Sequence, residues 1–119
     1  MGKTPVLVRT IPRDERIKQI TVILQTRPWL RLQELSEMAD LSPSRLQHLF
    51  KQETGRSIGA YTKDIQVNMI RDLLLHSRYP LKDIGQAVGV PDMANLGRYF
   101  KRRFGCTPAS YRRQFRLIA

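Results

Sequence analysis

The chain has 119 residues, enough for one compact domain or for two very small domains that share a connecting element. Hydrophobic residues make up 41% of it and charged residues 26%, the balance of a soluble globular protein, and no apolar run approaches the ~18 residues of a membrane span. The formal net charge of +11, from 21 Lys and Arg against 10 Asp and Glu, predicts a polyanionic partner, the alternative being a basic surface that is merely solvated.

Residues 1–11 are expected to form an N-terminal tail. Their longest apolar stretch, Val6 to Val8, is shorter than the roughly 7–15 apolar residues of a secretory signal, which predicts a cytoplasmic protein with no membrane partner. The single cysteine, Cys106, cannot form an internal disulfide, and with His48 and His76 it makes no ligand set at zinc spacing. We therefore expect no metal site.

Apolar residues recur at intervals of three and four, while Gly and Pro stand at segment boundaries, so the chain is predicted to be all-α. A first helix is expected from about Pro12 to Thr26, ending near Pro28. Its expected apolar stripe consists of Ile17, Ile20 and Leu24, widened by Val22 and Ile23.

The rest of the chain contains an internal repeat. The segment from Leu32 to Gly55 aligns with the segment from Leu81 to Gly105, at an offset of 49 residues (81 − 32) that becomes 50 (105 − 55) after a predicted turn. Each copy predicts a short helix, a turn of about three residues and a second, amphipathic helix, which is the helix-turn-helix pattern. A single helical hairpin would be weak evidence, but its repetition in a basic chain is specific.

Capping residues set the boundaries predicted for each copy. In the first copy, Leu35, Met38 and Ala39 form the expected buried side of the short helix, and in the second copy Gly89 is expected in the left-handed turn conformation. The residues expected to start or end the second helices are Ser42, Pro43, Asp92 and Gly105.

Between the copies, residues 57–77 predict one long helix bounded by Pro80. About 20 residues span ~30 Å, close to the ~34 Å between successive major-groove faces of B-DNA. The predicted organisation is therefore a tail of residues 1–11, a first helix-turn-helix subdomain of residues 12–56, a linker helix of residues 57–78 and a second helix-turn-helix subdomain of residues 79–116.

The second helix of the first copy predicts a DNA-reading face opposite its apolar stripe. Four residues at helical spacing and one on the flank make up this face: Ser44, Gln47, His48, Lys51 and Arg45. Gln pairs well with adenine, Ser and His can bond base edges or phosphate, and Lys51 is placed for a phosphate.

The equivalent face of the second copy is less polar. Its members are Ala94, Gly97, Arg98 and Lys101, with Met93 and Asn95 beside them, and Arg102 and Arg112 are further candidates for phosphate contacts. Arg98 suits guanine, whereas Met93 and Ala94 could offer only apolar contact, for instance to a thymine methyl. Gly97 inside a helix costs roughly 1 kcal/mol relative to alanine, which predicts close approach to the DNA backbone or to a neighbouring helix.

The sequence LSEMADLSPSRLQHLFKQETGRSIGAY in the first copy, and IGQAVGVPDMANLGRYFKRRFGCTPASYRR in the second, resemble the DNA-binding domain of the AraC/XylS family of bacterial transcription regulators. The second segment contains the run Gly-x-Thr-Pro-x-x-Tyr-Arg, from Gly105 to Arg112, and the resemblance extends over roughly Arg16 to Phe115. It implies seven helices in two homeodomain-like units, two recognition helices in adjacent major grooves, and no cofactor. We also expect RNA polymerase as a second partner, with activation and repression of the regulated genes both open.

The chain departs from the family pattern at four positions. The family usually has aromatic residues where Val90 and Leu96 stand, a basic residue at Gln66 and alanine at Ile70. These are mostly packing positions, so we expect the fold to be kept and the first copy to read more of the DNA sequence than the second. Two reading helices in one chain predict binding as a monomer.

Two alternatives remain. The chain is either a short stand-alone member of the family, which the initial Met1 favours, or a fragment of a longer ligand-responsive regulator. From another functional class, a non-specific nucleoid or RNA-binding protein would also be strongly basic. An enzyme is not expected, because no nucleophile-base pair or metal set is evident.

Overall fold

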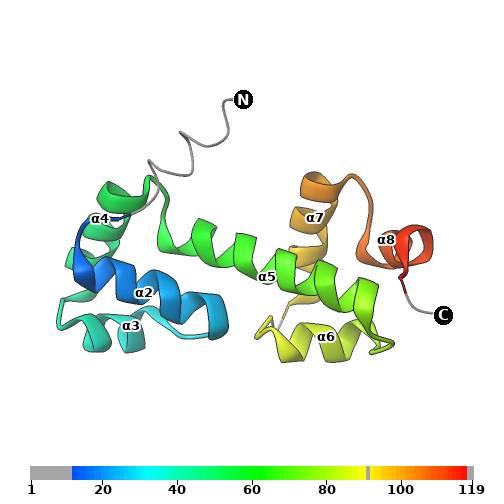
Figure 1. The fold of residues 1–119 in the computed structure, drawn as a ribbon, viewed down its shortest axis with the longest axis horizontal. Helices are drawn as coiled ribbons and strands as arrows, with labels where there is room; N and C mark the ends of the chain where they lie inside the picture. Colours follow the sequence, from blue (N-terminus) through cyan, green and yellow to red (C-terminus); the bar gives the residue numbers. More distant parts are fainter. Residues whose placement is uncertain (1–11, 91, 118–119) are drawn as a thin grey trace. The chain divides into compact units, whose positions relative to one another are not determined.

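The computed structural model describes residues 12–90 and 92–117, and the tail expected for residues 1–11 lies outside them. The described residues form helices and no strand, as the sequence predicts, and the helices number seven (Figure 1). They are α2 (Glu15–Thr26), α3 (Leu32–Ala39), α4 (Pro43–Thr54), α5 (Ile58–His76), α6 (Leu81–Ala87), α7 (Met93–Phe104) and α8 (Pro108–Phe115). No helix among them is both long and apolar enough to cross a membrane.

The chain folds as two compact units that divide inside α5. Unit 1 is Met1–Thr62 and unit 2 is Lys63–Ala119. Unit 1 therefore holds α2, α3, α4 and the first residues of α5, and unit 2 holds the rest of α5 with α6, α7 and α8. Each unit has a core of its own, so each reading helix is positioned by the packing of its own unit.

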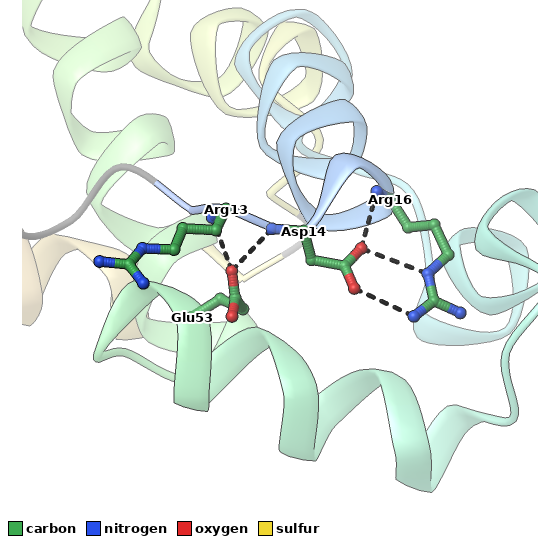
Figure 2. Close-up of polar contacts among 4 residues, drawn as sticks. All are labelled: Arg13, Asp14, Arg16 and Glu53. Atoms are coloured by element: carbon green, nitrogen blue, oxygen red, sulfur yellow. Dashed lines mark hydrogen bonds and ion pairs between the residues drawn. The ribbon is translucent and has the colours of Figure 1, made fainter.

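The start of α2 is fixed by two carboxylates (Figure 2). The Asp14 side chain accepts a hydrogen bond from the Arg16 backbone N–H at 2.8 Å, while the Glu53 carboxylate of α4 accepts from the backbone N–H groups of Arg13 and Asp14 at 2.7 and 2.8 Å. The hydrogen bond from the Arg16 side chain also lowers the pKa of the Asp14 carboxyl. Because Asp14 is the N-cap, the helix begins at Glu15 and not near Pro12 as predicted.

The core of unit 1 is formed where α2, α3 and α4 pack together. Its buried side chains are Ile17, Ile20, Leu24, Leu35, Ala39, Leu46, Leu49 and Phe50. Tyr61 of α5 closes one side of this core, because its ring meets Phe50 edge to face at 5.3 Å between centroids and its hydroxyl accepts from Gln25 Nε2 at 3.1 Å. Tyr61 thus packs against Phe50 of α4, the candidate reading helix, and is itself held by α2.

Two residues that the sequence predicted to be buried in unit 1 are exposed. Val22 is 67% exposed because it lies on the side of α2 opposite the stripe of Ile17, Ile20 and Leu24. Met38 is 45% exposed, and Ser36 is buried in its place, with its hydroxyl donating to the Gln33 carbonyl at 2.8 Å. The short hydroxyl can be buried because it is hydrogen-bonded within its own helix.

The core of unit 2 packs α5 against α6 and α7. Its buried members are Val67, Ile70, Leu74, Ile84, Val88, Leu96 and Phe100. Gln66 is also buried, and its Nε2 donates to the Val88 carbonyl at 3.1 Å. Ile70 and Leu96 are therefore packing residues, as expected where the chain departs from the family pattern.

The two helix-turn-helix units differ at one residue of the turn that follows their first helix. In unit 2 this turn contains Gly89 with a φ of 77°, as predicted, and in unit 1 the equivalent residue is Asp40 with a φ of 56°. Aspartate is among the few residues other than glycine that tolerate this left-handed conformation. The same change of direction is thus made by different residues in the two copies.

Candidate nucleic-acid interface

Helix α4 presents one polar face outward from unit 1. Ser42 caps it as predicted, its hydroxyl accepting from the Arg45 backbone N–H at 3.1 Å, and Pro43 occupies the first turn. Burial of Leu46, Leu49 and Phe50 fixes the rotation of the helix about its axis. Together these local features determine which side chains point outward.

All five residues predicted to read DNA from α4 are exposed, namely Ser44, Arg45, Gln47, His48 and Lys51. None of these side chains makes a hydrogen bond or ion pair with another residue of the described chain. Their donors and acceptors are therefore available to an external partner.

Helix α7 presents the corresponding face of unit 2. Asp92 caps it as predicted, accepting from the Asn95 backbone N–H at 3.2 Å, and Leu96 and Phe100 are buried. The candidate residues Ala94, Asn95, Arg98, Lys101 and Arg102 are exposed, while Met93 and Gly97 are partly buried. The Arg98 guanidinium donates to Asn95 Oδ1 at 3.3 Å, so the side chain with the strongest hydrogen-bonding capacity on this face is oriented by its neighbour.

Tyr99 connects the back of α7 to α5 within unit 2. Its hydroxyl donates to the Asp64 carboxylate, which also pairs with Arg103 Nη1 at 3.3 Å. Lys63 Nζ and the Arg102 guanidinium each lie 5.7 Å from the centre of the Tyr99 ring, within cation-π range. Sequence reasoning missed this cluster, because nothing in the local pattern of either helix pairs Asp64 with Tyr99, which lies 35 residues further along.

Arg112 makes several hydrogen bonds within unit 2. Its guanidinium donates to the carbonyls of Leu73, Leu74, Ser77 and Tyr79, at distances of 2.7 to 3.4 Å. Burial lowers the pKa of this guanidinium, and the charge of Arg116 lowers it further. Since the last carbonyls of a helix lack intrahelical partners, Arg112 caps the C-terminal end of α5, and these bonds compete with the phosphate contact that the sequence predicts for it.

A family model described as a helix-turn-helix domain matches residues 35–114, which include both reading helices. Among proteins of known function, the arabinose operon regulatory protein of Salmonella typhimurium is 38% identical over 72 residues, 60% of this chain and 26% of that protein. The multiple antibiotic resistance protein MarA of Escherichia coli is 34% identical over 83 residues, 70% of this chain and 65% of that protein. The chain belongs to the AraC/XylS family.

Solved structures agree with this assignment. The C-terminal domain of AraT, a response regulator from Geobacillus stearothermophilus, superposes with a TM-score of 0.77 at 27% identity and covers 89% of each chain. The DNA-binding domain of the transcriptional factor AdpA, solved in complex with a target DNA, has a TM-score of 0.76 at 20% identity and covers 86% of this chain and 94% of its own. At that identity the AdpA comparison supports the fold alone.

The two candidate reading faces of this AraC/XylS family member differ in chemistry. The α4 face offers a hydroxyl, an amide, an imidazole and two cations, whereas the first turns of α7 offer Met93, Ala94 and Gly97 before Arg98. Among the described residues, no group of three or more His, Cys, Asp or Glu could hold a metal ion. The exposure of most of these side chains on α4 and α7 makes the two faces the candidate interface.

Proposed function

We propose that this chain is a sequence-specific DNA-binding transcription regulator, with α4 and α7 as its recognition helices. The observation that carries the proposal is the α4 face, where five exposed polar or charged side chains have no partner among the described residues. Membership of the AraC/XylS family supports the same function. Because the chain aligns with 26% of the arabinose regulator and 65% of MarA, the activity of a whole regulator is part of the proposal.

The side chains of α4 divide into base readers and phosphate contacts. Gln47 can pair bidentately with adenine, and Ser44, Arg45 and His48 can reach base edges or phosphate. Lys51 lies in the last turn of α4, where a cation suits the DNA backbone. On α7, Arg98 is the base reader, and Lys101 with Arg102 are the phosphate contacts.

We also propose that the protein binds its DNA as a monomer in the cytoplasm and acts on transcription through RNA polymerase. The support is the pair of helix-turn-helix units in one chain, together with the family. Binding DNA through exposed side chains requires no catalytic group, so the proposal does not include an enzymatic activity.

The test is a footprint on DNA selected from a random pool, with random DNA as competitor. A specific regulator should protect a defined sequence and prefer it over random DNA by ~10³ or more at physiological salt. Equal protection of all sequences would instead support a non-specific nucleoid or RNA-binding protein, the alternative that the charge of +11 allows.

Substitution of single α4 residues tests which side chains contact bases. Gln47→Ala and His48→Ala should each change the base preferred at one or two positions of the selected site. Gln19→Ala is the matched control, because Gln19 is an exposed glutamine of α2, which the proposal does not place on DNA. If the selected sites of both α4 variants equal that of the wild type, Gln47 and His48 do not read bases.

A further inference from the structure

Beside the reading face of α7 lies an open groove of about 750 Å³, contained within unit 2. Its lining is mainly apolar and includes Leu81 of α6, Val90 of the turn, and Met93, Ala94 and Gly97 of α7. Lys82 contributes one cation to the edge of the groove. The first turns of the proposed recognition helix therefore border an apolar hollow rather than a polar surface.

Within this groove, Gly85 of α6 and Met93 of α7 are in close contact. A Cβ added to Gly85 would lie 2.6 Å from both Cγ and Sδ of Met93, so the Met93 side chain occupies the space that a larger residue at 85 would fill. Met93 also packs against the buried core of unit 2. Met93 therefore lines the groove and at the same time ties the start of α7 to α6 and to the core.

The rim of the groove is open. A Cβ added to Gly97 would meet no atom of the described residues within 4 Å, apart from the neighbouring backbone of its own helix. Ala94 is exposed and lies one turn before Gly97 on the same face. A ligand can therefore approach the α7 backbone closely at these two positions.

The same positions in unit 1 are polar, because Ala94 and Gly97 align with Ser44 and Gln47 in the repeat. The apolar character of this face is thus a difference between the two units rather than a requirement of the fold.

Charge indicates which ligand the groove suits. Lys82 lines the groove, Arg98 and Lys101 follow Gly97 along α7, and the chain has no acidic residue after Asp92. The only apolar group that a base pair presents in the major groove of DNA is the C5 methyl of thymine, and phosphates border it on both sides. An apolar groove with cations beside it matches a thymine methyl that has phosphates on both sides.

We propose that the α7 groove recognises thymine through its C5 methyl, with Ala94 and Gly97 as the contact positions and Met93 as the residue that positions them. The inference rests on the proposed DNA-binding function and adds the base that unit 2 prefers. Arg98, one residue beyond Gly97, would then read a guanine next to that thymine.

Replacing thymine by uracil in synthetic DNA tests the inference, because the change removes the methyl alone. The positions read by unit 2 are first identified as those where Arg98→Ala alters the selected sequence, together with the two base pairs on either side. We expect thymine at one or more of these positions. Its replacement by deoxyuridine should weaken binding by about three- to tenfold, as measured in a titration at fixed salt, in keeping with the loss of one buried methyl.

Ala94→Ser supplies the protein side of the test. The variant places a hydroxyl where unit 1 has Ser44. The difference in affinity between DNA with thymine and DNA with uracil should fall to less than twofold at the unit 2 positions. At all other positions this difference should stay unchanged. Ala87→Ser is the matched control, since Ala87 is exposed on α6 and does not line the groove. Thermal unfolding of each variant shows whether the fold is kept.

The outcomes separate the inference from the function. A preferred site that lacks thymine at the unit 2 positions, or that binds equally well with uracil there, overturns the inference and leaves specific DNA binding intact. Equal effects of Ala94→Ser and Ala87→Ser would also overturn it, because the groove would then not be the reader. If no sequence is preferred over random DNA, the proposed function fails and the inference fails with it.

Discussion

Gly97 lies in the middle of α7, where alanine would be the better helix former by about 1 kcal/mol. Sequence reasoning offered two explanations for this glycine, namely close approach to DNA or to a neighbouring helix. The second explanation is wrong for the part of the chain that the structure describes, because a Cβ at position 97 meets no neighbouring helix within 4 Å. Close approach to DNA remains as a prediction.

Gly97→Ala should therefore have opposite effects on stability and on DNA binding. We expect the variant to unfold at a higher urea concentration, with a gain of up to about 1 kcal/mol, because alanine restricts the unfolded chain and suits the helix. We expect its affinity for the preferred site to fall several-fold, because the added methyl occupies the open rim of the groove.

Gly59→Ala is the control for Gly97→Ala. Gly59 is also in a helix, and a Cβ there also meets no described atom within 4 Å. The control should gain stability in the same direction. Unchanged DNA affinity in Gly97→Ala would show that this glycine has no function at the interface.

At the scale of helices, local signals predicted the boundaries well. Ser42, Asp92 and Gly105 each act within a few residues of their own position, and all three cap the helices that the sequence assigned to them. Their chemistry depends on orphan backbone groups of the same helix, so no knowledge of the tertiary structure is needed.

Contacts between residues far apart in the sequence, and the burial of single apolar residues, could not be predicted from local signals. Arg112 was grouped with the phosphate contacts because of its charge, yet it binds carbonyls 33 to 39 residues earlier in the chain. Met38 and Val22 were counted as buried because they are apolar, although their angular positions on α3 and α2 face away from the core. Composition alone does not reveal which partner a residue meets or which face of a helix is covered.

The capping role of Arg112 gives a prediction for the end of α5. Arg112→Lys keeps the charge but loses the planar fork that bonds several carbonyls at once. We expect a loss of about 1–3 kcal/mol in the free energy of unfolding, since partly buried carbonyls lose their donors. Urea titration followed by circular dichroism measures this change.

Arg113→Lys is the control for Arg112→Lys, because Arg113 is exposed on the same helix. It should change the free energy of unfolding by less than about 0.5 kcal/mol. Equal losses in both variants would contradict the capping role. No loss of stability in Arg112→Lys, together with a salt slope of DNA binding flattened by about 1 in Arg112→Ala, would support a phosphate contact.

At the scale of the whole chain, the unit with the larger positive charge is not the unit with more polar side chains on its candidate recognition helix. Unit 1 carries a net charge of +4, from 10 basic and 6 acidic residues, and unit 2 carries +7, from 11 basic and 4 acidic residues. The richer reading face belongs to unit 1, on α4, while the larger positive charge belongs to unit 2. This distribution suits a protein in which unit 1 reads more of the sequence and unit 2 contributes more of the electrostatic affinity.

Phosphate contacts made by both units should appear in the salt dependence of binding. Each phosphate contact changes the slope of log K against log salt by about 0.9, because one bound cation releases counterions from the duplex. Lys51→Ala and Lys101→Ala should therefore each flatten this slope by about 1 and weaken preferred and random DNA alike. Lys18→Ala, an exposed lysine of α2, is the control and should leave the slope unchanged. If Lys51→Ala or Lys101→Ala instead changed the preferred sequence at an unchanged slope, that lysine would be a base reader and the division between reading and anchoring residues would need revision.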